Sequence, residues 1–99
     1  MIYKLTLKEG VMKDLSKLSN KQEDLVLKQF KKLETSPQLG DYLGNKAGYN
    51  LSGCRKLYVD NKKIRIVYQI IDDKVIVEVI VVGKRDDMRV YSEAHKRLN

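Results

Sequence analysis

Two apolar runs in the second half of the chain limit most strongly what it can fold into. They span residues 64–71 and 75–82, consist mainly of Ile and Val, and are separated by the pair Asp72-Asp73. Runs of this length around a short polar turn are typical of a β-hairpin. Because both runs are apolar at odd and at even positions, both faces of the hairpin must be at least partly covered.

A third strand is predicted just before this hairpin. From Cys54 onward, Leu57 and Val59 alternate with Lys56 and Tyr58, and a turn follows at 60–63. This period of two is typical of a strand with one apolar face. The strand at 54–59 therefore precedes the hairpin in an antiparallel meander.

The N-terminal third has helical spacing after a short strand at 2–7. A first helix is predicted around 11–18, and a second from an N-cap at Asn20, with Glu23 three residues on, to about Glu34. The break between them is short, so they should form an antiparallel hairpin. The glycine-punctuated stretch 38–53 is predicted to be a connecting loop, and 86–98 a short, weakly anchored helix.

These elements predict one small α+β domain, residues 1–99, in the order β-α-α-β-β-β. A mostly antiparallel twisted sheet should carry the helical hairpin on one face and a short C-terminal helix. The chain has 99 residues, too few for a second domain. Its 20 Lys and Arg against 13 Asp and Glu give a net charge of +7, which suits a nucleic acid or an acidic protein partner.

Several classes of protein are disfavoured by what the sequence lacks. Cys54 is the single cysteine, so a disulfide scaffold is excluded and a cytoplasmic location is expected. One Cys and one His make a metal site improbable on ligand number, and no cofactor is predicted. No apolar stretch predicts a signal peptide or a membrane span.

The arginines are distributed unevenly. All five lie in the second half, whereas the first half carries its positive charge as lysine. Arginine makes planar, bidentate contacts with phosphate, and lysines on helices are more often solvated. The second half is therefore the candidate for phosphate recognition. The arginines are Arg55, Arg65, Arg85, Arg89 and Arg97.

Strand parity predicts which of these side chains meet. If Leu57 and Val59 face the helical hairpin, Lys56 faces the opposite side. On the return strand, Glu78 marks the wetter face, shared with Ile76 and Ile80. The meander then brings four residues toward one concave patch: Lys56, Arg65, Arg85 and Tyr91.

Such a patch suits the cleavage of RNA, which carries its own nucleophile, the 2′-hydroxyl. The reaction requires deprotonation of that hydroxyl, stabilisation of charge on phosphorus and protonation of the leaving 5′-oxygen. Arg65 and Arg85 could supply the charge, and Lys56 and Tyr91 could exchange protons if neighbouring cations lower their pKa values.

The same residues resemble a known family, the RelE toxins of the RelE/ParE superfamily. The resemblance covers essentially the whole chain and is strongest from Cys54 to Leu98. Its motifs are Cys54-x-Lys56, Arg65-Ile-Val-Tyr68-Gln-Ile, the Asp72-Asp73 turn, Val81-Val-Gly83-Lys84-Arg85 and Val90-Tyr91-Ser-Glu-Ala94. The helical hairpin ending at Ser36-Pro37 and the Leu43-Gly44 loop also fit.

The resemblance implies the toxin of a type II toxin–antitoxin system. Such a toxin is a metal-independent, ribosome-dependent endoribonuclease that cuts mRNA in the A site by 2′-hydroxyl attack and inhibits translation. It implies catalytic roles for Lys56, Arg65, Arg85 and Tyr91. One position departs from the pattern: where RelE sequences have a second Lys two residues after the first, this chain has Tyr58.

On this hypothesis Arg65 and Arg85 hold the scissile phosphate, and Arg85 or a water that it orders protonates the leaving group. Lys56 or Tyr91 assists deprotonation of the 2′-hydroxyl, and Tyr91 can also stack on a base. Residues expected to bind RNA around this centre are Arg55, Tyr58 and Lys84.

The implied partners are the ribosome, mRNA and a RelB-like antitoxin, with DNA reached only through the toxin–antitoxin complex and no membrane. An acidic amphipathic chain that folds on binding would neutralise a small basic domain well. Two alternatives remain open at this point. One is a ParE-like inhibitor of DNA gyrase that cuts no RNA, and the other is a non-cutting half of a DNA-binding repressor.

Overall fold

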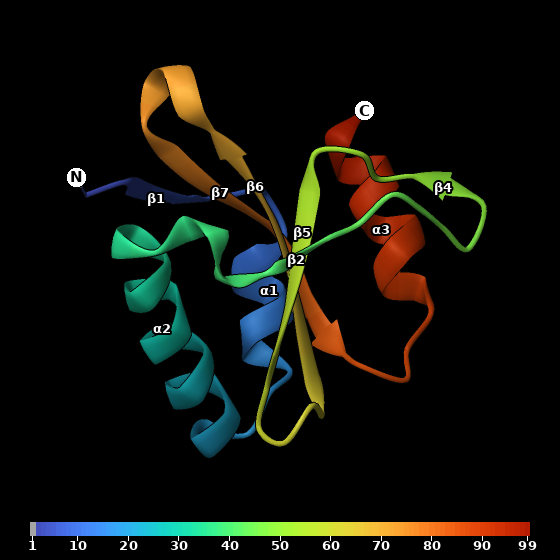
Figure 1. Cartoon of the computed structure of the whole chain (residues 1–99). Coiled ribbons are helices and arrows are strands. Elements are labelled where there is room, and N and C mark those ends of the chain that lie inside the picture. Colours follow the sequence, from blue (N-terminus) through green and yellow to red (C-terminus); the bar gives the residue numbers. More distant parts are fainter. Residues whose placement is uncertain (1) are drawn as a thin grey trace.

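A five-stranded mixed sheet forms the centre of the molecule in the computed structural model, which describes residues 2–99 (Figure 1). The predicted domain included residue 1, which lies outside the residues that the structure describes. The strand order is β1-β7-β6-β5-β2. β1 runs parallel to β7, and the other pairs are antiparallel. The strands are β1 (Lys4–Leu7), β2 (Asp41–Tyr42), β5 (Cys54–Val59), β6 (Ile64–Ile71) and β7 (Ile76–Lys84).

The predicted α+β fold with a mostly antiparallel sheet is confirmed, and so is the meander β5-β6-β7. The Asp72-Asp73 turn is a short 3₁₀ segment, η2 (Asp72–Lys74), and closes the central hairpin. Residues 64–68 of β6 and 79–82 of β7 are buried, as expected for strands that are apolar on both faces, and the ends next to η2 are partly exposed.

The helical hairpin α1 (Val11–Ser16) and α2 (Asn20–Thr35) covers one face of the sheet. The second helix begins differently from the prediction. Ser19, not Asn20, is the N-cap: its side chain accepts a hydrogen bond from the backbone of Gln22, and the Gln22 side chain reaches back. The apolar core on this face consists of Val11, Leu15, Val26, Phe30, Leu33, Val59, Ile64, Ile66, Tyr68, Val77, Val79 and Val82.

The helix α3 (Arg89–Leu98) covers the opposite face, together with a small hairpin of β3 (Asn45–Lys46) and β4 (Tyr49–Asn50). Figure 1 shows α2 and α3 on opposite sides of the sheet. The helix begins three residues later than the predicted 86. The stretch 38–53, predicted as loop, holds three two-residue strands that periodicity could not reveal, and a 3₁₀ turn, η1 (Pro37–Leu39), overlaps its start.

A β-bulge in β7 changes which of its side chains are exposed to solvent, compared with the prediction. Val67 pairs with Val81 and Tyr68 with Val79, so Ile80 has no residue opposite. Ile80 and Val81 both join the core beneath α3, and Ile80 is fully buried. The prediction that Ile80 shares a wetter face with Glu78 is therefore wrong, because α3 covers this end of the sheet.

Helix α3 is also anchored more firmly than its polar sequence predicted. The Arg97 guanidinium donates to the Asp14 carboxylate on α1 at 2.8 Å and to the backbone oxygen of Ile80 at 2.8 Å. Asp14 in turn accepts from the Val82 backbone at 3.0 Å. This ion pair joins α1, β7 and α3, so the expectation of a weakly anchored tail is wrong. No helix within residues 2–99 is long and apolar enough to cross a membrane.

Candidate active site

One row across the three central strands defines the candidate site. Tyr58 on β5 lies opposite Arg65 on β6, and Arg65 lies opposite Gly83 on β7. A Cβ atom on Gly83 would stand 2.6 Å from a methyl carbon of Val90, so glycine allows α3 to approach the sheet here. That close approach places the next residue of α3, Tyr91, over the row.

Arg65 is the most unusual residue of the row. The residue as a whole is only 5% exposed. Among residues 2–99, Arg65 is the single charged residue that is buried. Its guanidinium carbon lies 4.5 Å from the centre of the Tyr91 ring and 5.7 Å from that of Tyr58. Its Nε and Nη1 atoms are buried and have no hydrogen-bond partner. A buried guanidinium with unused donors is costly in isolation and well suited to an anion.

Three cations lie close to the Tyr58 ring: Lys56, Arg65 and Arg85. Lys56 Nζ donates a hydrogen bond to the Tyr58 hydroxyl at 3.2 Å, and the Arg85 guanidinium carbon lies 5.6 Å from the Tyr58 ring centre. The hydrogen bond from Lys56 lowers the pKa of Tyr58 from its ordinary value of 10.0 to about 8. Arg65 acts in the same direction, and partial burial opposes both.

Arg85 leaves the sheet directly after β7. Its backbone N–H donates to the oxygen of Lys63 at 2.9 Å, which ties it to the β5–β6 turn. That turn begins with three residues of positive φ, 60–62, and Asp60 accepts a hydrogen bond from Gln22 of α2 at 3.0 Å. The turn is therefore held against α2 and cannot be a loose connection.

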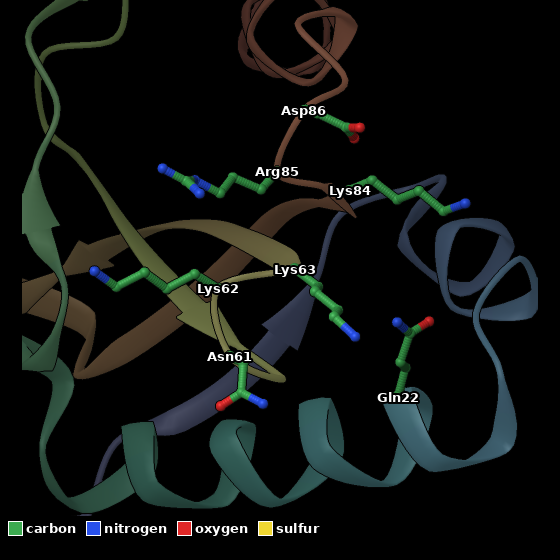
Figure 2. A pocket seen from close by; sticks show the side chains of 7 residues that line it. All are labelled: Gln22, Asn61, Lys62, Lys63, Lys84, Arg85 and Asp86. Atoms are coloured by element: carbon green, nitrogen blue, oxygen red, sulfur yellow. The ribbon is translucent and has the colours of Figure 1, made fainter.

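A basic cavity of about 520 Å³ adjoins the Tyr58 cluster and shares Arg85 with it. Figure 2 shows Lys84 and Arg85 pointing in different directions from the end of β7. Lys62 and Lys63 line the same cavity from the turn. A cavity lined by several cations suits the phosphate backbone of a nucleic acid. The lining residues are Gln22, Asn61, Lys62, Lys63, Lys84, Arg85 and Asp86.

The structure thus brings together the four predicted catalytic residues and Tyr58. Lys84 borders the neighbouring cavity. Arg55 lies apart: its guanidinium donates to the backbone oxygen of Gly40 at 2.7 Å and stacks on Tyr42 at 3.9 Å. Those contacts fasten β2 to β5 and leave Arg55 outside the cluster.

Sequence reasoning missed the environment of two tyrosines. Tyr91 is 4% exposed beneath Arg65, so its ring positions that guanidinium and could stack on a base only after being uncovered. Tyr58 was expected only to contact RNA, although the alternation with Lys56 on the same strand face was the signal for their contact. Among residues 2–99, no three His, Cys, Asp or Glu side chains gather as a metal site would require.

Comparisons with known proteins place this fold and site in a defined class. The model of the family described as ParE toxin of type II toxin-antitoxin system matches residues 5–89. The class is therefore a toxin of a type II toxin–antitoxin system.

Individual relatives narrow the class. The mRNA interferase toxin RelE of Escherichia coli is 37% identical over 98 residues, 99% of each chain. The structure of a doubly substituted E. coli RelE in the free state superposes with a TM-score of 0.80 at 34% identity over 100% of both chains. RelE in the intact E. coli RelBE toxin–antitoxin complex superposes with a TM-score of 0.66 at 34% identity. This match covers 83% of the present chain and 95% of the RelE chain. The chain belongs to the RelE toxins of the RelE/ParE superfamily.

Proposed function

We propose that the protein is the toxin of a type II toxin–antitoxin system and cleaves mRNA on the ribosome. The observation that carries the proposal is the buried Arg65 guanidinium, whose Nε and Nη1 donors have no partner within the protein. A scissile phosphate would satisfy both donors. Arg85, whose guanidinium carbon lies 5.6 Å from the Tyr58 ring centre, would hold the same phosphate.

The site supports transphosphorylation by the RNA itself. Arg65 and Arg85 stabilise the charge that develops on the phosphoryl oxygens. Lys56, in hydrogen-bond contact with Tyr58, belongs to the proton-transfer part of the site. The leaving 5′-oxygen receives its proton from Arg85 or from a water held by it. Tyr91 acts on this chemistry through Arg65, whose guanidinium it underlies.

The relatives favour this function over gyrase inhibition. The curated relatives at 37% identity are named mRNA interferases, and the matching solved structures are of RelE. A ParE-like inhibitor would have no use for two arginines around an ionisable tyrosine. The ribosome supplies what a small cluster of cations lacks, namely an ordered substrate, and positioning contributes strongly to such reactions.

The proposed partners follow from charge and from the same relatives. RelE of E. coli has been solved with RelB and with a RelB peptide, so we propose a RelB-like antitoxin for this chain. An acidic antitoxin segment would complement the net charge of +7. DNA is reached only through the toxin–antitoxin complex, and the protein acts in the cytoplasm, where its mRNA substrate is translated.

End-mapping of an mRNA on programmed ribosomes tests the proposal, with naked mRNA alongside. We expect cuts in the A-site codon only when ribosomes are present. Arg65→Ala and Arg85→Ala should each abolish the cuts and the growth inhibition without unfolding the protein. Arg89→Ala is the matched control, because Arg89 is exposed and pairs with Asp87 away from the cluster.

Two results would contradict the proposal. One is intact mRNA in every reaction together with inhibited supercoiling by gyrase, which would support the ParE-like alternative. The other is a folded double variant, lacking both Arg65 and Arg85, that remains toxic.

A further inference from the structure

We propose that Tyr58, as its phenolate, is the base that takes the proton from the 2′-hydroxyl of the RNA. The inference rests on the proposed ribonuclease function and deepens it. It assigns a chemical role to Tyr58, the position where the candidate site departs from the RelE motif noted in the sequence.

The arrangement around Tyr58 is that of a stabilised phenolate. The charged or titratable groups facing it are Lys56 on its own strand, Arg65 on β6, Arg85 beyond β7 and Tyr91 of α3 behind Arg65. Three of these are cations, and Lys56 donates directly to the phenol oxygen at 3.2 Å. Lys56, and after it Arg65, lower the pKa of Tyr58 to about 8 against the opposing effect of partial burial. A third cation, Arg85, with its guanidinium carbon 5.6 Å from the ring centre, also favours the charged form.

The other candidates for the base are less suitable. Lys56 is the donor in its bond to Tyr58, and an ammonium group accepts no hydrogen bond. The Tyr91 ring is 4% exposed and lies under the Arg65 guanidinium. Tyr58 is only partly buried, and the guanidinium carbons of Arg65 and Arg85, proposed to hold the phosphate, lie 5.7 and 5.6 Å from its ring centre. A 2′-hydroxyl next to that phosphate would therefore lie near the Tyr58 oxygen.

The proposed step balances with water as the only co-reactant. The Tyr58 phenolate accepts the 2′-hydroxyl proton while the 2′-oxygen bonds to phosphorus and the bond from phosphorus to the 5′-oxygen breaks. The products are a 2′,3′-cyclic phosphate and a 5′-oxygen, which takes a proton from a water at Arg85. The hydroxide left behind takes the proton from Tyr58, which restores both water and phenolate.

Single-turnover cleavage on programmed ribosomes, measured from about pH 6 to about pH 9, tests this role. The wild-type rate should rise with pH and level off near the Tyr58 pKa of about 8. Tyr58→Phe should lower the rate by about 10²- to 10⁴-fold, the usual contribution of a general base, and abolish this rise. Lys56→Met should move the rise to higher pH, because the phenolate loses its closest donor.

The matched control is Tyr3→Phe. Tyr3 hydrogen-bonds Asp72 at the far end of the sheet, so its loss removes a phenol outside the site. This variant should cleave with the wild-type rate and pH profile. Tyr58→Phe cleaving as fast as Tyr3→Phe, with an unchanged profile, would overturn the role of Tyr58 and leave the proposed function intact. A wild-type protein that cuts no mRNA would instead overturn the proposed function.

A second measurement needs no cleavage. The chain has six tyrosines and no tryptophan, so phenolate formation is visible by ultraviolet absorption. The difference between the titrations of the wild type and Tyr58→Phe should show one group ionising near pH 8. A difference titration that begins only near the ordinary tyrosine value of 10.0 would refute the inference, whatever the activity.

Discussion

Replacing Arg65 by methionine should make the protein more stable while it abolishes cleavage. Each of the two buried guanidinium nitrogens without a partner costs about 1–3 kcal/mol relative to its hydration in the unfolded chain. The cation–π contact, with the Arg65 guanidinium carbon 4.5 Å from the Tyr91 ring centre, stabilises the native state by roughly 2 kcal/mol and offsets part of this cost. Methionine keeps the apolar length of the side chain and leaves no donor unsatisfied. We therefore expect the free energy of unfolding to rise by about 2 kcal/mol, within a range of about 0–4 kcal/mol set by these two terms.

Urea and thermal unfolding of the wild type and Arg65→Met measure this difference. For a domain of this size, each kcal/mol corresponds to a shift of roughly 4–8 °C in Tm. Arg89→Met is the control, because the Arg89 side chain is 89% exposed and its loss should change stability little. The ribosome assay on the same samples should show cleavage lost in Arg65→Met and retained in the control.

The reasoning is refuted if Arg65→Met is less stable than the wild type by more than about 1 kcal/mol. Arg65 would then be a structural residue whose contacts stabilise the native state. Retained cleavage by a stable Arg65→Met protein would refute the phosphate role instead.

Three further predictions concern other parts of the structure. Tyr68→Phe removes a buried hydroxyl that bonds backbone groups of the segment 37–40 at 2.7 and 2.8 Å, and should cost about 1–3 kcal/mol in urea unfolding. Gly83→Ala drives a methyl group into Val90 at 2.6 Å, so α3 should lose hydrogen-exchange protection while the central strands keep theirs. For Tyr58, the lowered pKa means that between about pH 8 and the ordinary value of 10.0 the native state has released a proton that the unfolded chain still holds. Its contribution to stability is therefore complete above the ordinary value and is lost as the pH falls through about 8. The difference in Tm between the wild type and Tyr58→Phe should accordingly grow as the pH is raised through this window, and a difference independent of pH would contradict it.

Local sequence patterns determined most of the architecture. The apolar runs 64–71 and 75–82, the alternation after Cys54 and the helical spacing before Pro37 were sufficient for the meander and the helical hairpin. These elements can be predicted from the sequence because the periodicities of strands and helices involve residues only a few positions apart. The same parity argument correctly separated Leu57 and Val59, which pack beneath the helical hairpin, from Lys56, which contacts Tyr58 on the other face.

Contacts between distant segments were decided only by the tertiary structure. The bulge at Ile80 depends on how β7 packs beneath α3, and the pair of Arg97 with Asp14 joins residues 83 apart in the chain. The two-residue strand β2 exists only because β5 lies beside it. No local pattern encodes such pairings, since their free energy comes from burial and charge neutralisation that arise after the chain has folded.

The site shows the same division at the level of single residues. The sequence by itself determined that Arg55 and Arg65 flank an alternating segment and that Tyr58 lies between them. Only the fold decided that Arg55 fastens a strand while Arg65 is buried with unused donors, and that three cations surround the Tyr58 phenol. The physical reason is that pairing and ionisation depend on the dielectric and charge of the whole surroundings, which four different elements contribute here.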